Sequence, residues 1–400
     1  MSRHTPPLLP AAALGLVAIT AVAQEGPQNP LARELIGTVR QVYDGALYPD
    51  LQVNTFRNID RLFPTRMVPA GGHAYPLPER AEKLQNFTFE SRGKRFDLYD
   101  YLALNRVAGL LVVKDGEVAF ERYFLGNTRE TRWMSMSVVK SITATLVGMA
   151  IRDGHIGSID DPLTRYLPAF EGTAYDGVSV RNLLQMTSGV DWNETYTDPT
   201  SDRRAMLEAQ ISQQPGSILA LMARLGRAAE PGTRWNYSTG ETQVVGALVA
   251  AATGIPVAEY LTEKLWKPFG METPATWWLE SPGGLEIGGS GLSATLRDYA
   301  RFGLFMLNGG IVNGRPTLPD GWIEEATSPK VISGDKVEYG YMWWPMPHGA
   351  YAAIGIFGQY VYVRPDRGVV VAMWGAQPKP VGTDVIDEYD FLTALSDAVR

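Results

Sequence analysis

The chain has 400 residues, a formal net charge of −7 at pH 7 and no cysteine. The acidic balance, without any long Lys/Arg run, argues against a nucleic-acid partner. The lack of cysteine excludes disulfides, cysteine-ligated metals and thiol nucleophiles. Hydrophobic residues make up 45% of the chain, which is too many for a disordered protein, and the length suffices for a large core and two lobes.

The N-terminus has the pattern of an export signal. Arg3 supplies a positive charge, residues 8–19 are apolar or small, and residues 21–23 form an A-x-A cleavage site. The apolar stretch is short for a membrane span and contains Pro10. We predict that residues 1–23 are a cleaved signal peptide, and that the mature protein is periplasmic or secreted without membrane contact after cleavage. An uncleaved anchor is the alternative.

Hydrophobic periodicity and turn residues predict the secondary structure in chain order. A helix is expected near residues 31–43, and two strands flank the turn at Asp115-Gly116. The central part of the chain shows only helix patterns, and strand patterns return near the C-terminus. The expected strands are residues 108–113, 117–124, 339–344, 351–354, 359–364 and 369–374, and the later helices are residues 133–151, 180–186, 241–253, 296–307 and 387–399.

The expected strands therefore lie toward both ends of the chain and are joined by short turns. Hairpin connections are typical of antiparallel sheets. We predict an α/β (α+β) fold, in which an antiparallel sheet is flanked by helices and an all-helical lobe is inserted between its two halves. The predicted boundaries are residues 24–141 and 326–400 for the sheet lobe and residues 142–325 for the helical lobe.

Histidine and metal chemistry has little support in this sequence. The four histidines show no HxH, HxxxH or HExxH spacing. Neither a G-x-S-x-G elbow nor a phosphate-binding G-x-x-x-x-G-K-[ST] loop occurs, and the stretch Gly288-Gly289-Ser290-Gly291 lacks the final glycine of an elbow. We therefore predict no metal and no organic cofactor.

Ser137 and Lys140 form an S-x-x-K tetrad near the start of the helix expected over residues 133–151. Residues three apart share a helix face, so the lysine amine can reach the serine hydroxyl. The positive end of the helix dipole disfavours the ammonium form of Lys140, and a neutral lysine can take the proton of a serine. Such tetrads also occur by chance, and residues 91–94 are a second example in a polar segment without an apolar helix.

Two later elements carry further candidate residues. Tyr237 lies in a turn-rich loop, residues 231–240, just before an expected helix. Gly355 and Gly358 end an expected strand, where glycine permits the close approach of a backbone or a ligand. Taken singly, Tyr237 could equally be a tyrosine that packs in the core, and the glycines could mark a β-bulge.

Together and in this order, the three elements resemble the serine β-lactamase/penicillin-binding-protein superfamily. The resemblance is closest to its class C-like branch, which includes esterases and 6-aminohexanoate-dimer hydrolases. It extends over residues 105–376 and includes further blocks at residues 153–168, 183–189, 265–271 and 291–295. Several blocks in the order of the family are far more specific than one tetrad.

The resemblance implies a role for each matched residue. Ser137 would be the nucleophile, Lys140 its activating partner, and Tyr237 the tyrosine that transfers a proton to the leaving group. The N–H groups of Ser137 and Ile356 would form the oxyanion hole. Gly355 and Ile356 would contact the substrate along the strand edge that matches the K-T-G element of the family.

Three positions bear on the substrate: two depart from the pattern of the family and one matches it. Ala353 stands where the K-T-G element has lysine, and Thr239 stands where the Y-x-N element has asparagine. The missing lysine would help to hold the carboxylate of a β-lactam, so its loss favours linear substrates. Tyr196 resembles a substrate-closing loop tyrosine of the 6-aminohexanoate-dimer hydrolases, and a surface aromatic is the alternative.

The predicted function is an exported serine hydrolase that cleaves carboxylic esters or short linear amides through an acyl-enzyme on Ser137. Its partner would be a small-molecule substrate, and the sequence leaves the oligomeric state open. A β-lactamase or D-Ala-D-Ala carboxypeptidase, which would use the same nucleophile, is the first alternative. A non-catalytic or slowly acylating penicillin-binding sensor is the second.

Overall fold

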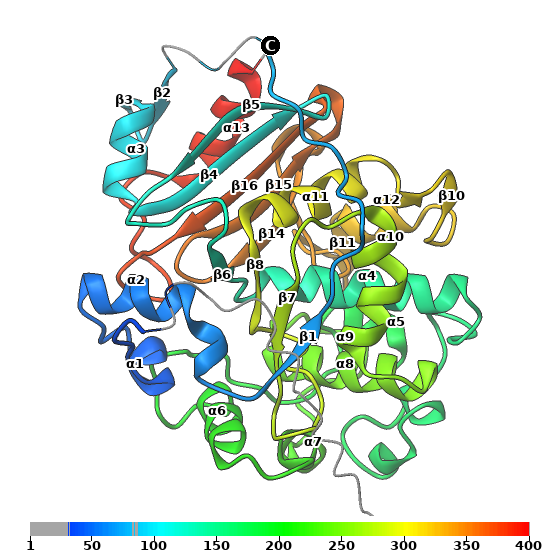
Figure 1. Cartoon of the computed structure of the whole chain (residues 1–400). Helices are drawn as coiled ribbons and strands as arrows, with labels where there is room; N and C mark the ends of the chain where they lie inside the picture. The colour runs from blue at the N-terminus through cyan, green and yellow to red at the C-terminus, as the bar shows by residue number, and fades with distance from the viewer. Residues whose placement is uncertain (1–30, 32, 82–83, 85–86, 400) are drawn as a thin grey trace, which may run out of the picture.

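The computed structural model describes residues 31, 33–81, 84 and 87–399, so the predicted signal peptide lies outside the described residues. The framework is a six-stranded antiparallel sheet in the order β13-β14-β15-β16-β4-β5 (Figure 1). Distant parts of the chain meet in its centre, where Val371 of β16 lies opposite Val112 of β4. This confirms the predicted antiparallel sheet. Its strands are β4 (Val107–Lys114), β5 (Glu117–Tyr123), β13 (Trp344–Pro345), β14 (Tyr351–Gly355), β15 (Gln359–Arg364) and β16 (Val369–Gly375).

Helices cover both faces of this sheet (Figure 1). α11 (Leu296–Leu307) contacts β15 and β16 on one face, and α3 (Leu98–Leu104) and α13 (Glu388–Ala398) lie on the other. Neighbouring residues of β16 point to opposite faces, so Val370 and Val371 belong to different cores. Because both faces are buried, the central strands β4 and β16 are nearly unbroken apolar runs and show no alternation.

A second antiparallel sheet has the order β1-β7-β8-β6, and it corrects two predictions. Trp133 and Met134 are predicted to be helical but lie in β6, and the central region predicted to hold only helices contributes β7 and β8. Both strands are only four residues long and fully buried, and such short runs are ambiguous by periodicity. Ala275–Trp278 does not alternate, and Leu292–Thr295 alternates but directly precedes the helical pattern of α11. The strands are β1 (Thr65–Val68), β6 (Arg132–Met134), β7 (Ala275–Trp278) and β8 (Leu292–Thr295).

Helices fill most of the central part of the chain. Two of them, α4 and α8, are buried along nearly their whole length and pack against each other. The helices are α1 (Val39–Asp44), α2 (Pro49–Arg57), α4 (Val138–Arg152), α5 (Val180–Leu184), α6 (Asp202–Ser212), α7 (Ser217–Arg224), α8 (Thr239–Thr253), α9 (Val257–Leu261), α10 (Lys267–Phe269) and α12 (Trp322–Thr327). Three small hairpins complete the fold: β2 (Thr88–Ser91) with β3 (Lys94–Asp97), β9 (Ile311–Val312) with β10 (Arg315–Pro316), and β11 (Lys330–Ile332) with β12 (Asp335–Val337).

Some predicted boundaries shift. α8 begins two residues early because the Ser238 hydroxyl accepts the Glu241 N–H and caps the helix. Of the strand predicted over residues 339–344, only Trp344 lies in a strand, and of the helix predicted over residues 31–43, only the C-terminal part is helical. The division into lobes at residues 141 and 325 stays a prediction. Within the described part of the chain, no single helix has the length and apolar character to cross a membrane. One pair of helices, Thr239–Thr253 and Val257–Phe269, meets the two criteria jointly, but its two parts are bent by 75° relative to each other.

Candidate active site

The turn between β6 and α4 presents Ser137 at the start of a buried helix. Met136, directly before it, has φ 41°, a left-handed conformation that costs free energy in a residue other than glycine. Ser137 occupies the N-cap position of α4, but its side chain makes no capping hydrogen bond. The hydroxyl is therefore not used to hold the end of the helix and can serve another purpose.

The side chain of Lys140 reaches this hydroxyl, as the spacing predicts. Its Nζ donates to Ser137 Oγ at 3.1 Å, to Thr239 Oγ1 at 2.9 Å and to the carbonyl oxygen of Gly289 at 2.9 Å. Burial lowers the pKa of Lys140 to about 7, an effect that the charge of Glu194 opposes. A lysine with this pKa is in large part a neutral amine at neutral pH, and it can accept the serine proton.

Tyr237, from the loop before α8, lies on the other side of the same amine. The Nζ atom of Lys140 is 5.3 Å from the centroid of the Tyr237 ring. Burial, with the charge of Glu194 adding to it, raises the pKa of Tyr237 above its ordinary value, and a hydrogen bond with Ser137 opposes this. The phenol therefore keeps its proton near neutral pH and can donate it. Trp344 stacks on the ring at 5.9 Å and fixes its plane.

The end of β14 lies directly against the turn that carries the serine. A Cβ atom on Gly355 would be 2.6 Å from the carbonyl oxygen of Ser135 and 3.1 Å from the amide nitrogen of Ser137. Only glycine allows this approach without displacing the backbone. Ile356 follows Gly355 and lines the same cavity as Ser137.

One cavity of about 960 Å³ brings together five of the six predicted site residues, namely Ser137, Tyr196, Tyr237, Gly355 and Ile356. The sixth, Lys140, is buried behind the serine. The wall of this cavity, called the Ser137 cavity below, also includes Asp44, Glu194 and Lys379. No sequence motif marks Asp44 or Lys379, because they reach the cavity from remote segments.

Three groups around Lys140 were not identified as functional from the sequence: Thr239, Gly289 and Glu194. The sequence marks Thr239 only as a replacement of the asparagine of the Y-x-N element. In the structure its hydroxyl accepts a hydrogen bond from Lys140 and donates one to Glu194. Gly289 was dismissed with the incomplete nucleophile elbow, and its carbonyl binds the lysine. The paired glycines at 288–289 were a usable signal of close backbone approach. Glu194 had no signal except its place in the loop of Tyr196.

The substitution at Ala353 has a different structural meaning. This residue lies in β14 with its side chain fully buried in the core, and it is not part of the cavity lining. Its methyl group therefore supplies no polar contact to a ligand. At this position the chain therefore lacks the lysine that the family resemblance associates with binding the carboxylate of a β-lactam.

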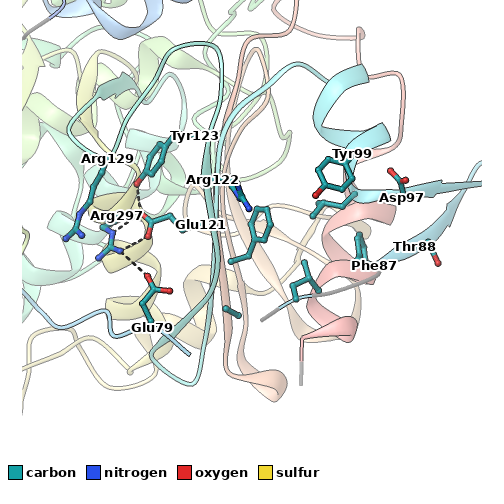
Figure 2. A pocket seen from close by; sticks show the side chains of 14 residues that line it. Glu79, Phe87, Thr88, Asp97, Tyr99, Glu121, Arg122, Tyr123, Arg129 and Arg297 are labelled. Atoms are coloured by element: carbon teal, nitrogen blue, oxygen red, sulfur yellow. Dashed lines mark hydrogen bonds and ion pairs between the residues drawn. The ribbon is translucent and has the colours of Figure 1, made fainter. Parts of the chain in front are cut away.

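A second cavity, of about 990 Å³, lies beside β5 and the β2–β3 hairpin (Figure 2). Its charged side chains largely neutralise one another: Arg297 donates two hydrogen bonds to Glu121, and the Tyr123 hydroxyl donates to the same carboxylate. Neither serine nor lysine is among its lining residues. This second cavity therefore lacks the serine–lysine pair that the Ser137 cavity holds.

In this site a buried lysine contacts a serine hydroxyl, and a tyrosine ring lies beside the lysine amine. This arrangement, on a mixed fold of antiparallel sheets and helices, defines a class of serine hydrolases that work without histidine. Comparison with protein families agrees: the family model described as Beta-lactamase matches residues 104–395. The chain belongs to this β-lactamase family.

Individual relatives carry names from several activities. The chain is 31% identical over 301 residues to the 6-aminohexanoate-dimer hydrolase of Paenarthrobacter ureafaciens, covering 71% of this chain and 76% of the relative. It is 30% identical over 177 residues to esterase EstB of Burkholderia gladioli, covering 40% and 44% of the two chains. A Bacillus anthracis structure, provisionally named a 6-aminohexanoate-dimer hydrolase, aligns with a TM-score of 0.76 at 22% identity over 87% of this chain and 92% of its own. At that identity the structural match supports the fold alone.

Proposed function

We propose that the protein hydrolyses carboxylic esters or short linear amides through an acyl-enzyme on Ser137. The observation that carries the proposal is the 3.1 Å contact between Lys140 Nζ and Ser137 Oγ at the wall of an open cavity. The lowered pKa of Lys140 makes this pair a nucleophile and its base. Two relatives by sequence are named a 6-aminohexanoate-dimer hydrolase and an esterase.

Acylation begins when neutral Lys140 takes the proton of Ser137 and the serine oxygen attacks the carbonyl carbon of the substrate. The charge that develops on the carbonyl oxygen is held by the N–H groups of Ser137 and Ile356. Loss of one such donor typically lowers the rate by about 10²–10³. Tyr237 gives its proton to the leaving alcohol or amine and recovers one from the Lys140 ammonium.

Deacylation reverses these roles. Water attacks the acyl carbon, and Tyr237 takes a proton from that water as it passes its phenol proton to neutral Lys140. The Lys140 ammonium then protonates the serine oxygen as it leaves. The same two N–H groups hold the second oxyanion. The proton can pass between Tyr237 and Lys140 because the phenol ring and the amine adjoin each other.

The charges of the cavity favour uncharged substrates over anionic β-lactams. Ala353 supplies no cation, and the lining holds one cation, Lys379, with four acidic side chains, Asp44, Glu194, Asp384 and Glu388. Arg204 and Arg92 neutralise Asp44 and Asp384 in part. A missing charge-assisted hydrogen bond costs about 1.5–3 kcal/mol. That corresponds to a loss of about ten- to a hundredfold in kcat/KM for an anionic substrate.

Export is part of the proposal and rests on residues 1–23. The apolar segment with its A-x-A end would direct the chain out of the cytoplasm and be removed after residue 23. N-terminal sequencing of protein recovered from the periplasm or the medium should begin at Gln24. A retained Met1 on membrane-bound protein would contradict cleavage and favour an anchor.

A substrate panel tests the catalytic proposal. Nitrophenyl acetate and butyrate, a linear 6-aminohexanoate dimer and a chromogenic cephalosporin should be compared on the wild type and on Ser137→Ala. We expect turnover of an ester or of the linear amide, weak cephalosporin turnover, and no turnover by the variant. Strong cephalosporin turnover with a flat ester response would favour the β-lactamase alternative, and stable acylation without turnover would favour the sensor. Full activity of Ser137→Ala would refute the proposal.

A further inference from the structure

Glu194 is tied into the reaction centre from the loop that also carries Tyr196. Its Oε1 atom accepts the hydroxyl proton of Thr239. Its Oε2 atom accepts the backbone N–H of Thr239 at 2.9 Å and the indole N–H of Trp192 at 2.6 Å. Both oxygens are therefore fixed, and the carboxylate has one orientation relative to the start of α8.

The direction of the Thr239 hydrogen bonds determines what Lys140 can do. A hydroxyl has one proton, and this one is committed to Glu194, so Thr239 Oγ1 can only accept from Lys140. A neutral amine has two N–H groups and one lone pair. The Thr239 oxygen at 2.9 Å and the Gly289 carbonyl at 2.9 Å take these two N–H groups. The third direction faces Ser137 Oγ at 3.1 Å; it carries an N–H in the ammonium form, and the lone pair in the neutral amine.

The alternative orientation would disable the base. If the Thr239 hydroxyl were not held by a carboxylate, it could rotate and donate its proton to the Lys140 lone pair. The lone pair would then no longer be available to the serine. We propose that Glu194 is a positioning residue, which keeps Thr239 as an acceptor and so reserves the lone pair of Lys140 for the proton of Ser137.

This inference rests on the proposed function, because it concerns the base of that reaction. The other groups that act on the Lys140 amine are the charge of Arg203, which opposes Glu194, and the ring of Tyr237. Glu194 is thus the negative group that favours the ammonium form. Its replacement by glutamine should make deprotonation of Lys140 easier. Because two N–H groups point at the Oε2 position, the amide oxygen is expected there, and the NH2 group, a donor, would then face the Thr239 hydroxyl in place of an acceptor.

The test measures the second-order rate constant for modification of Ser137 by a small nitrophenyl phosphonate, from pH 5 to pH 9, by intact mass. In this reaction the serine oxygen forms a bond to phosphorus, nitrophenolate leaves with the bonding electrons, and the serine proton goes to Lys140. For Glu194→Gln we expect the plateau rate constant to fall about tenfold or more. The midpoint of the acidic limb should move to lower pH.

Two further variants separate positioning from charge and from general damage. Thr239→Val removes the hydroxyl but leaves the Glu194 charge, so it should lower the plateau without moving the midpoint to lower pH. Asp191→Asn removes one negative charge from the same loop at an exposed position, and should change neither quantity. An unchanged Glu194→Gln profile would overturn the inference, and so would a lower plateau with an unmoved midpoint. Modification of Ser137→Ala at the wild-type rate would instead refute the proposed function.

Discussion

The contact between Gly355 and the serine turn gives the sharpest prediction. In Gly355→Ala, the new methyl group would lie 2.6 Å from the Ser135 carbonyl oxygen and 3.1 Å from the Ser137 amide nitrogen. Ordinary contact needs an increase of about 0.5–1 Å, and both neighbours are backbone atoms. The strand or the turn must therefore move, and the proposed oxyanion hole spans that boundary.

The magnitude follows from the groups that move. Loss of one oxyanion donor costs about 10²–10³ in kcat, or about 2.7–4 kcal/mol. We expect Gly355→Ala to lower kcat on a nitrophenyl ester by this amount, with a smaller change in KM. Gly72→Ala is the matched control, because a Cβ atom there has no heavy atom within 4 Å. Thermal denaturation should show both variants folded. Wild-type kcat in a folded Gly355→Ala protein would refute the reasoning.

Three further predictions concern titration. Because Lys140 has a pKa of about 7 and acts as a neutral base, kcat/KM should fall about tenfold per pH unit below that value and level off above it; a flat profile from pH 5 to 8 would contradict this. Replacing Lys140 by methionine should abolish turnover yet raise the melting temperature near pH 7 relative to the wild type, and the gain should shrink toward pH 10, because the unfolded chain binds the lysine proton more tightly. Burial raises the pKa of Glu241 to about 8, so its contribution to stability is full near pH 4 and is lost as the pH rises to 8; the melting temperature of Glu241→Gln should gain on the wild type across that window.

Parts of the fold with strong periodicity could be predicted from the sequence. The helix over residues 296–307 has the predicted bounds, because its apolar face recurs at helical spacing and Asn308 begins a turn. The β4–β5 hairpin was marked by the Asp115-Gly116 turn. Strands β7 and β8 could not be found in this way, because each has only four residues, all buried, and so short a run is not separated from the neighbouring helical patterns by periodicity.

The site residues also divide into those that local spacing predicts and those that it does not. Ser137 and Lys140 lie three residues apart on one helix, so their contact is local and follows from spacing. The roles of Tyr237 and Ile356 were inferred from the family resemblance, because no local sequence rule places residues a hundred or more positions away beside Ser137. Glu194 could not be predicted, because its role depends on which way a hydroxyl points, and this is set only after two loops meet.

The buried base also explains why so many backbone constraints gather at this point. A lysine becomes neutral near pH 7 only if water is excluded from its amine, and an amine without water needs acceptors from the protein. The carbonyl of Gly289 meets that need only because the chain passes close to α8: a Cβ atom on Gly288 would lie 2.4 Å from the carbonyl oxygen of Thr242. The glycines at 288 and 289, the glycine at 355 and the strained Met136 are thus consequences of one requirement. Each lets backbone replace water around Lys140 and Ser137, so close packing is a condition for the neutral base that Glu194 and Thr239 then orient.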